Sequence, residues 1–172
     1  MSETPGGGHD SQAGDHQGPE SSGAAPDGDP YSWYRRGLEL LGRGSPAAAE
    51  QLLARAAEAE PGSRSVLEAL GRAQFGAGRY AAAADSFRQI VEASPSDDYA
   101  HFGLGLALAR GGDPAAAAEH LALAAAMRPE LRHYTEALRG VRATLRARAE
   151  AASGARGPEE PDPAGPAREE TS

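Results

Sequence analysis

The 172-residue sequence contains neither cysteine nor lysine. The absence of cysteine excludes a disulfide framework, thiolate metal ligands and a thiol nucleophile. The absence of lysine excludes a phosphate-loop lysine, a Schiff base and a lysine general base. All 17 basic residues are arginine, and with 22 glycines and 13 prolines this composition is typical of coding in a GC-rich genome.

Aromatic residues and long apolar runs are also scarce. Only 5% of the residues are aromatic, so a buried core has to be built largely from alanine and leucine. The longest apolar stretch, residues 121–127, is far too short to cross a bilayer. The segment 1–30 shows no basic cluster followed by an apolar run, as a secretory signal would. We therefore expect a cytoplasmic protein.

A regular repeat organises the middle of the chain. Three prolines are equally spaced, and three glycines recur at the same interval, each at the same distance upstream of its proline. These residues are Pro61, Pro95 and Pro129, and Gly37, Gly71 and Gly105. A fixed period of about 34 residues is typical of stacked-repeat proteins, in which each unit buries its apolar face against its neighbours.

Each repeat is predicted to hold two helices. In its first half, apolar residues three and four positions apart form one helical face, as Leu67 and Leu70 do before Gly71. A glycine inside a helix costs about 1 kcal/mol relative to alanine. Its threefold recurrence therefore predicts that another backbone passes too close for a side chain.

A second recurring glycine is predicted to end the first helix, and a small and a large residue one turn apart mark the second helix. In the outer repeats Ser45-Pro46 and Asp113-Pro114 follow this glycine, so we expect a side-chain cap with proline at the first helical position. The closing proline of the repeat ends the second helix. The turn glycines are Gly44, Gly78 and Gly112, and the pairs are Ala49 and Leu53, Ala83 and Phe87, and Ala117 and Leu121.

This pattern resembles the tetratricopeptide repeat (TPR), here of a small bacterial type, which places Trp, Leu-Gly, an aromatic, Ala, an aromatic and Pro at fixed positions in a unit of about 34 residues. The matching residues are Trp33, Gly37, Gly44, Ala49, Ala56 and Pro61; Leu70, Gly71, Gly78, Tyr80, Ala83, Phe87 and Pro95; and Leu104, Gly105, Gly112, Ala117, Ala124 and Pro129. In departure from the pattern, Arg36 stands where leucine is usual, and Leu67 and His101 replace Trp. The resemblance implies an all-α, right-handed solenoid of three helix-turn-helix repeats, 30–63, 64–97 and 98–131.

Both ends of the chain are predicted to be disordered tails, because they lack the apolar residues needed to offset the entropy of ordering. Residues 1–29 carry six acidic and no basic residues, and the Pro/Glu-rich segment 153–172 carries five acidic residues and two arginines. Residues 30–152 keep 15 arginines and 14 acidic residues. The acidic character therefore belongs to the tails.

One more helix, over residues 132–152, follows the third repeat. It has an apolar face and several arginines, so we interpret it as a capping helix that covers the last repeat and presents a polar face to solvent. The alternative is an arginine patch for nucleic acid or an anionic membrane surface. The apolar residues are Tyr134, Leu138, Val141 and Leu145, and the arginines are Arg132, Arg139, Arg142, Arg146 and Arg148.

No motif supports catalysis or a cofactor. Gly76, Gly78 and Ala81 fit a dinucleotide fingerprint, but they follow a predicted helix rather than a strand, so they form no phosphate site. Neither a Gly-x-Ser-x-Gly elbow nor His-Glu-x-x-His is present. Because the remaining candidate ligands, His101, His120 and His133, fall at different repeat positions, we predict separate surface or packing residues. We expect no enzyme, no metal and no cofactor.

What remains is a binding surface. In the TPR family the first helix of every repeat lines a concave face, and its outward positions here are rich in aromatic residues, which usually indicates contact with a partner. The predicted groove residues are Tyr31, Tyr34, Leu38, Glu68, Arg72, Phe75, Tyr99, Phe102, Leu106 and Arg110. The residues predicted to define the repeat are Trp33, Gly37, Pro61, Gly71, Phe87, Pro95, Gly105 and Pro129.

The groove is predicted to bind a partner protein through an amphipathic helix or an extended apolar peptide. The electropositive clamp that some TPR proteins use for a terminal carboxylate is not supported, because its five positions hold other residues. These are Tyr34, Leu38, Ala69, Tyr99 and Gly103. We therefore expect a non-enzymatic adaptor, with self-association through the same groove as an alternative. Nucleic acid is the less favoured partner, and we expect no membrane partner.

Overall fold

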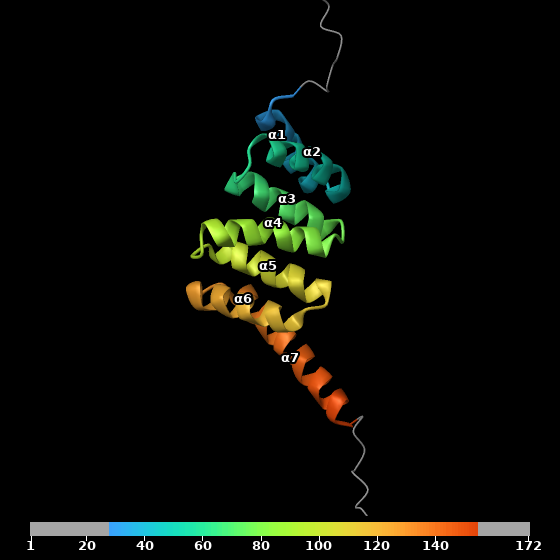
Figure 1. The fold of residues 1–172 in the computed structure, drawn as a ribbon, viewed down its shortest axis with the longest axis vertical. Coiled ribbons are helices and arrows are strands. Elements are labelled where there is room, and N and C mark those ends of the chain that lie inside the picture. Colours follow the sequence, from blue (N-terminus) through green and yellow to red (C-terminus); the bar gives the residue numbers. More distant parts are fainter. Residues whose placement is uncertain (1–27, 155–172) are drawn as a thin grey trace, which may run out of the picture.

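The computed structural model describes residues 28–154, which form seven α-helices and confirm the predicted all-α repeat array (Figure 1). Of the two predicted tails, residues 1–27 and 155–172 lie outside the described residues. The helices are α1 Pro30–Gly42, α2 Pro46–Ala59, α3 Arg64–Gly76, α4 Tyr80–Ala93, α5 Asp98–Gly111, α6 Pro114–Met127 and α7 Arg132–Gly154.

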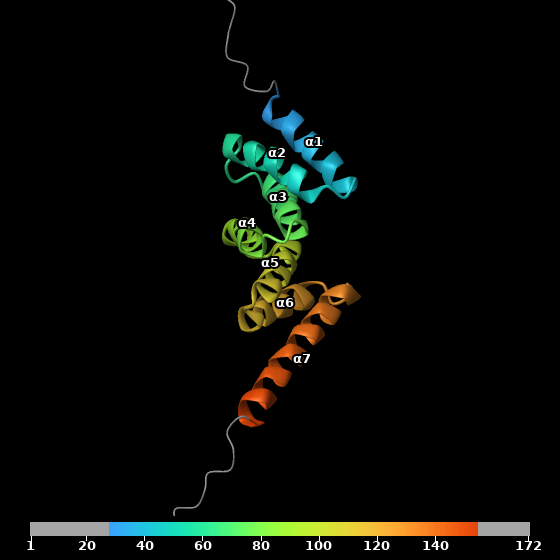
Figure 2. The ribbon, with the colours of Figure 1, turned by 90° about the vertical axis from the view of Figure 1, so that its right-hand side faces the viewer.

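Consecutive helices pack side by side along the stack (Figures 1 and 2). In addition, α1 contacts α3, α3 contacts α5, and α5 contacts α7. Among the described residues, no comparable contacts join α2 to α4 or α4 to α6. The odd-numbered helices therefore lie closer together and line the inner side of the curved array.

Large side chains of the partner helix are the closest neighbours of the glycines that recur inside α1, α3 and α5. A Cβ atom on Gly37 would lie 2.5 Å from the Leu53 side chain, and one on Gly71 would lie 2.8 Å from the Phe87 ring. The same atom on Gly105 would lie 2.6 Å from Leu121 and 3.2 Å from the Ala117 carbonyl oxygen. The prediction of a close backbone therefore holds in part at Gly105 and was wrong at Gly37 and Gly71, where the large residue of the small-and-large pair fills the space over the glycine.

The turns inside the repeats depend on glycine and on selected side-chain caps. Gly44, Gly78 and Gly112 have φ of +73°, +77° and +99°, a left-handed conformation that only glycine adopts readily. Asp113 caps α6 as predicted, since its carboxylate accepts a 3.0 Å hydrogen bond from the Ala116 amide. The predicted cap at Ser45 was wrong: its side chain makes no such bond. The turn is closed instead by its backbone N–H, which donates to the Leu40 carbonyl.

The core consists mainly of alanine and leucine, as the scarcity of aromatic residues predicts. Three buried clusters follow one another along the stack, one for each helix pair and its neighbour. The largest fully buried side chains are Tyr134, Leu53, Leu104 and Leu121. No helix of the described part is long and apolar enough to cross a membrane.

The last helix covers the end of the array. Val141 of α7 joins Ala117 and Leu121 of α6 in one buried cluster, and Tyr134 is only 2% exposed. The five arginines of α7 are exposed. The carboxyl-terminal part of α7 projects away from the stack (Figure 2), and the helix continues to Gly154, two residues past its predicted end.

Candidate functional site

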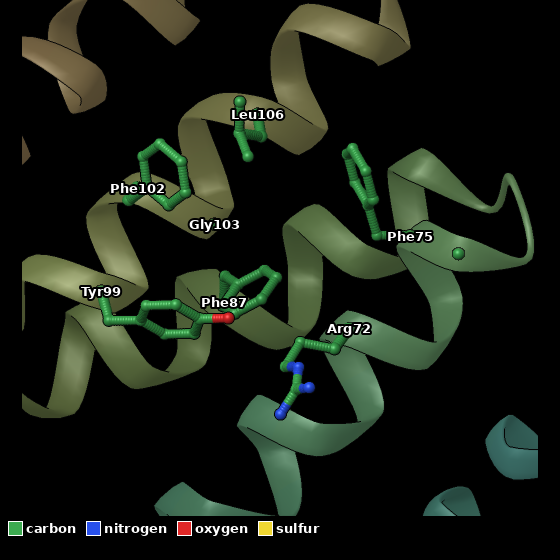
Figure 3. Close-up of a pocket in the computed structure, with 8 residues that line it drawn as sticks. Arg72, Phe75, Phe87, Tyr99, Phe102, Gly103 and Leu106 are labelled. Carbon is green, nitrogen blue, oxygen red and sulfur yellow. The ribbon is translucent and has the colours of Figure 1, made fainter. Parts of the chain in front are cut away.

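A pocket of about 250 Å³ opens between α3 and α5. Its lining residues are Arg72, Phe75, Gly76, Phe87, Tyr99, Phe102, Gly103 and Leu106 (Figure 3). Five of the ten residues predicted for the groove, Arg72, Phe75, Tyr99, Phe102 and Leu106, are among them. The structure thus brings together the central part of the predicted set.

Helical spacing explains why these side chains meet. Arg72 and Phe75 are three residues apart on α3, and Tyr99, Phe102 and Leu106 follow at intervals of three and four on α5. Residues at these intervals lie on one face of a helix. Because α3 and α5 are neighbours, the two faces form opposite walls of one depression.

Phe87 of α4 forms the floor of the pocket and lies between glycines of the two wall helices. A Cβ on Gly71 would lie 2.8 Å from its ring, and a Cβ on Gly103 would lie 2.6 Å from it. The missing side chain at Gly103 leaves space above the ring. Sequence reasoning assigned Phe87 to the repeat framework and missed Gly103, although a second glycine only two residues from Gly105 was a signal for it.

Aromatic contacts hold the α5 wall against the last helix. Phe102 stacks on Tyr134 with ring centroids 4.4 Å apart, and it lies nearly perpendicular to the His133 ring, with centroids 5.2 Å apart. Tyr99 packs against Phe87 at 6.3 Å. Phe102 and Tyr99 are therefore half-buried, less exposed than the prediction of an open aromatic patch required.

The rim of the pocket carries the polar groups. Arg72 is exposed, and Tyr99 is half-buried. Burial raises the pKa of the Tyr99 hydroxyl, an effect that the nearby Arg72 charge opposes. The hydroxyl is therefore protonated at neutral pH and can donate a hydrogen bond. Glu68, one turn before Arg72, pairs with Arg64 at 3.2 Å.

The other predicted groove residues lie outside this pocket. Tyr31, at the start of α1, is 65% exposed. Tyr34 and Leu38 pack against the buried cluster around Leu53, so they belong in part to the core. Arg110 is exposed near the end of α5, one turn beyond Leu106.

Five of the eight residues predicted to define the repeat are buried or half-buried. Gly37, Gly71 and Gly105 are buried under partner side chains, and Trp33 is half-buried. Phe87 belongs to the central core cluster. The three prolines, Pro61, Pro95 and Pro129, are exposed and lie between the repeats.

Two histidines that we predicted to be separate are paired. The Nδ1 atoms of His101 and His120 lie 3.0 Å apart, and Nε2 of His101 is 3.0 Å from the Pro95 carbonyl oxygen. A carbonyl can only accept, so Nε2 donates and the Nδ1 of neutral His101 is left as an acceptor for His120. The antiparallel packing of α5 and α6 brings them together. Residues 28–154 hold no cluster of three or more potential metal ligands.

Comparison with known proteins identifies the repeat. A family model described as tetratricopeptide repeat matches residues 34–98 and 69–131, which together make up more than half of the chain. The chain belongs to the tetratricopeptide repeat family. Such domains typically bind proteins or peptides and are generally non-catalytic.

Several solved TPR structures share this fold. MamA (41-end) from Desulfovibrio magneticus RS-1 has a TM-score of 0.66 and 22% identity, over 73% of this chain and 71% of that chain. The first TPR of Spaghetti (RPAP3), bound to the HSP90 peptide SRMEEVD, has a TM-score of 0.63 and 17% identity, over 67% of this chain and 92% of that chain. YrrB, described as a TPR protein with an unusual peptide-binding site, has a TM-score of 0.62 and 21% identity, over 65% of this chain and 58% of that chain. No curated protein sequence matches the chain.

Proposed function

We propose that the protein is a non-enzymatic adaptor that binds a partner protein on the inner face formed by α1, α3 and α5. The observation that carries this proposal is the apolar pocket between α3 and α5, walled by Phe75, Tyr99, Phe102 and Leu106. A concave apolar site with a few polar groups at its edge is the usual form of a binding site.

The chemistry of the pocket supports binding rather than catalysis. Among the described residues, the titratable side chains that line it are Arg72 and Tyr99. General acid–base catalysis needs a group whose pKa lies near the working pH, and an arginine and a tyrosine with a raised pKa do not supply one. Within residues 28–154, no carboxylate, histidine or serine lines the pocket to act as base or nucleophile.

The partner differs in kind from the HSP90 peptide SRMEEVD that the first TPR of RPAP3 binds. The positions that hold cationic and amide side chains in a carboxylate clamp are here Tyr34, Leu38, Ala69, Tyr99 and Gly103. A segment with an apolar face, helical or extended, suits this surface better.

Affinity capture from the lysate of the native host tests the proposal. The bait is the full chain, as wild type and as Leu106→Glu, which puts a charge into the pocket wall. Leu123→Glu is the matched control, because Leu123 is 46% exposed on α6 and away from the pocket. All baits must show the same helicity by circular dichroism.

We expect a protein that wild type and Leu123→Glu retain and Leu106→Glu loses. Equal capture by all three baits would contradict the proposal. Sedimentation of the purified chain separates this result from self-association, since a monomer at high concentration cannot be held by its own copies. Added salt separates it from arginine-mediated binding of nucleic acid, which weakens steeply with salt.

A further inference from the structure

The pocket between α3 and α5 has the size of one large side chain. Sites for cofactors and drug-sized ligands usually enclose about 300 to 1,000 Å³, and this pocket encloses about 250 Å³. Its walls are Phe75, Tyr99, Phe102 and Leu106 and its floor is Phe87 (Figure 3). A single bulky apolar side chain therefore fits the space and its chemistry.

Two hydrogen-bond donors at the edge of the pocket lack partners. Within residues 28–154, neither the Arg72 guanidinium nor the Tyr99 hydroxyl makes a side-chain hydrogen bond or ion pair. Both line the same pocket, and Figure 3 shows them at one edge of it, beside Phe87. An acceptor with a negative charge would satisfy both groups.

The rim also carries arginines with which no carboxylate of the described residues pairs. Arg72 is one of them; the nearest acidic residue on α3, Glu68, pairs instead with Arg64, which Asp97 also contacts. Arg110 is exposed on the same face of α5 as Leu106, and no carboxylate of the described residues lies within ion-pair distance of it. Charge complementarity across an interface therefore favours an acidic ligand.

We propose that this pocket selects a partner protein segment that carries a bulky apolar residue with an Asp or Glu within about one helical turn of it. The apolar side chain enters the pocket, and the carboxylate accepts hydrogen bonds from Arg72 and Tyr99. This inference rests on the proposed function and narrows it to a class of ligand. In this proposal the carboxylate belongs to an Asp or Glu side chain near the apolar residue that enters the pocket, and not to the carboxyl terminus of the partner.

A displayed library of random peptides, selected on the full chain, tests the inference without knowledge of the natural partner. We expect enriched peptides to share one Leu, Met, Phe or Trp and an Asp or Glu within four positions. The strongest peptide is then synthesised with its acidic residue as Glu, Gln or Arg. Each form is titrated against wild type and variants by fluorescence anisotropy.

Charge reversal supplies the decisive comparison. Arg72→Glu should lower the affinity for the Glu peptide about fivefold to tenfold, as expected when an exposed ion pair is replaced by two like charges. The affinity of this variant for the Gln peptide should stay within about twofold of the wild-type value. Its affinity for the Arg peptide should be higher than that of wild type. Tyr99→Phe, which removes only the hydroxyl, should lower the affinity for the Glu peptide more than the affinity for the Gln peptide. Arg55→Glu, on an exposed position of α2, is the matched control and should bind all peptides as wild type does.

The variants distinguish failure of this inference from failure of the proposed function. If Leu106→Glu abolishes peptide binding while Arg72→Glu changes no affinity, the acidic requirement is overturned and the groove remains. If no peptide is enriched, or if the enriched peptides bind Leu106→Glu as tightly as wild type, both proposals are overturned.

Discussion

The Tyr134 hydroxyl donates a 2.9 Å hydrogen bond to the Asp98 carboxylate and so joins the start of α7 to the start of α5. The phenol ring is 2% exposed and stacks on Phe102 of the pocket wall. Burial and this bond, together with the nearby carboxylate charge, raise the pKa of Tyr134. Tyr134 of the last helix, α7, therefore supports the α5 wall of the pocket.

Tyr134→Phe should lower the free energy of unfolding by about 1 to 2 kcal/mol, because it leaves a part-buried carboxylate without its hydroxyl donor. Arg128, 3.8 Å from Asp98, compensates only in part. Urea denaturation followed by circular dichroism measures the change. Tyr31→Phe is the control, since Tyr31 is exposed and should change stability by less than about 0.5 kcal/mol. Equal effects of the two substitutions would show that the Asp98 bond contributes nothing.

Gly103→Ala should destabilise the protein by about 1 to 3 kcal/mol, because the added methyl group meets the Phe87 ring, which also lies against Gly71. Gly140→Ala is the matched substitution within a helix. A Cβ there meets nothing within 4 Å, so the better helix propensity of alanine should raise stability by up to about 1 kcal/mol. Thermal denaturation of both variants gives the comparison. The packing account fails if Gly103→Ala is as stable as Gly140→Ala.

His120 should make the stability of the protein depend on pH. Burial lowers the pKa of His120, and the neighbouring His101 lowers it further; Glu119 opposes this effect and Arg88 adds to it. Because the folded pKa lies below the unfolded value of about 6.5, the unfolded state binds protons more readily. Full stability is therefore expected above about pH 7, with a loss as pH falls through 6.5 toward 5.

Denaturation midpoints between pH 5 and 8 measure this dependence. His120→Gln should flatten the profile, since glutamine does not titrate and can still hydrogen-bond to His101. His133→Gln replaces an exposed histidine and should leave the profile as in wild type. A His120→Gln profile as steep as that of wild type would assign the dependence to other groups.

The repeat period predicted the fold well because the same local contacts recur. Within each helix hairpin, a glycine of the first helix fits under a large residue of the second, and a glycine in the left-handed conformation makes the turn between them. Three copies of this pattern therefore predict six helices. The pocket was predicted less completely. Its wall residues follow from helical spacing, but its floor depends on how Phe87 fits between Gly71 and Gly103 of two different repeats.

The histidine pair shows a further limit of reasoning by repeat position. His101 and His120 occupy unrelated positions of the period, yet they lie on the two helices that the short turn between α5 and α6 joins. An antiparallel hairpin brings such residues together regardless of the period. Phe102 was predicted to be exposed for a related reason: the ring of Tyr134, which covers it, comes from the helix after the last repeat.

Site-specific cross-linking tests the central claim, that a partner binds the inner face, most directly. Since the sequence has no cysteine, Arg110→Cys and Leu123→Cys each carry a single benzophenone label, one beside the pocket and one on α6. We predict that the captured partner cross-links to the label at position 110 and not to the label at position 123. Cross-linking at 123 without cross-linking at 110 would contradict the account.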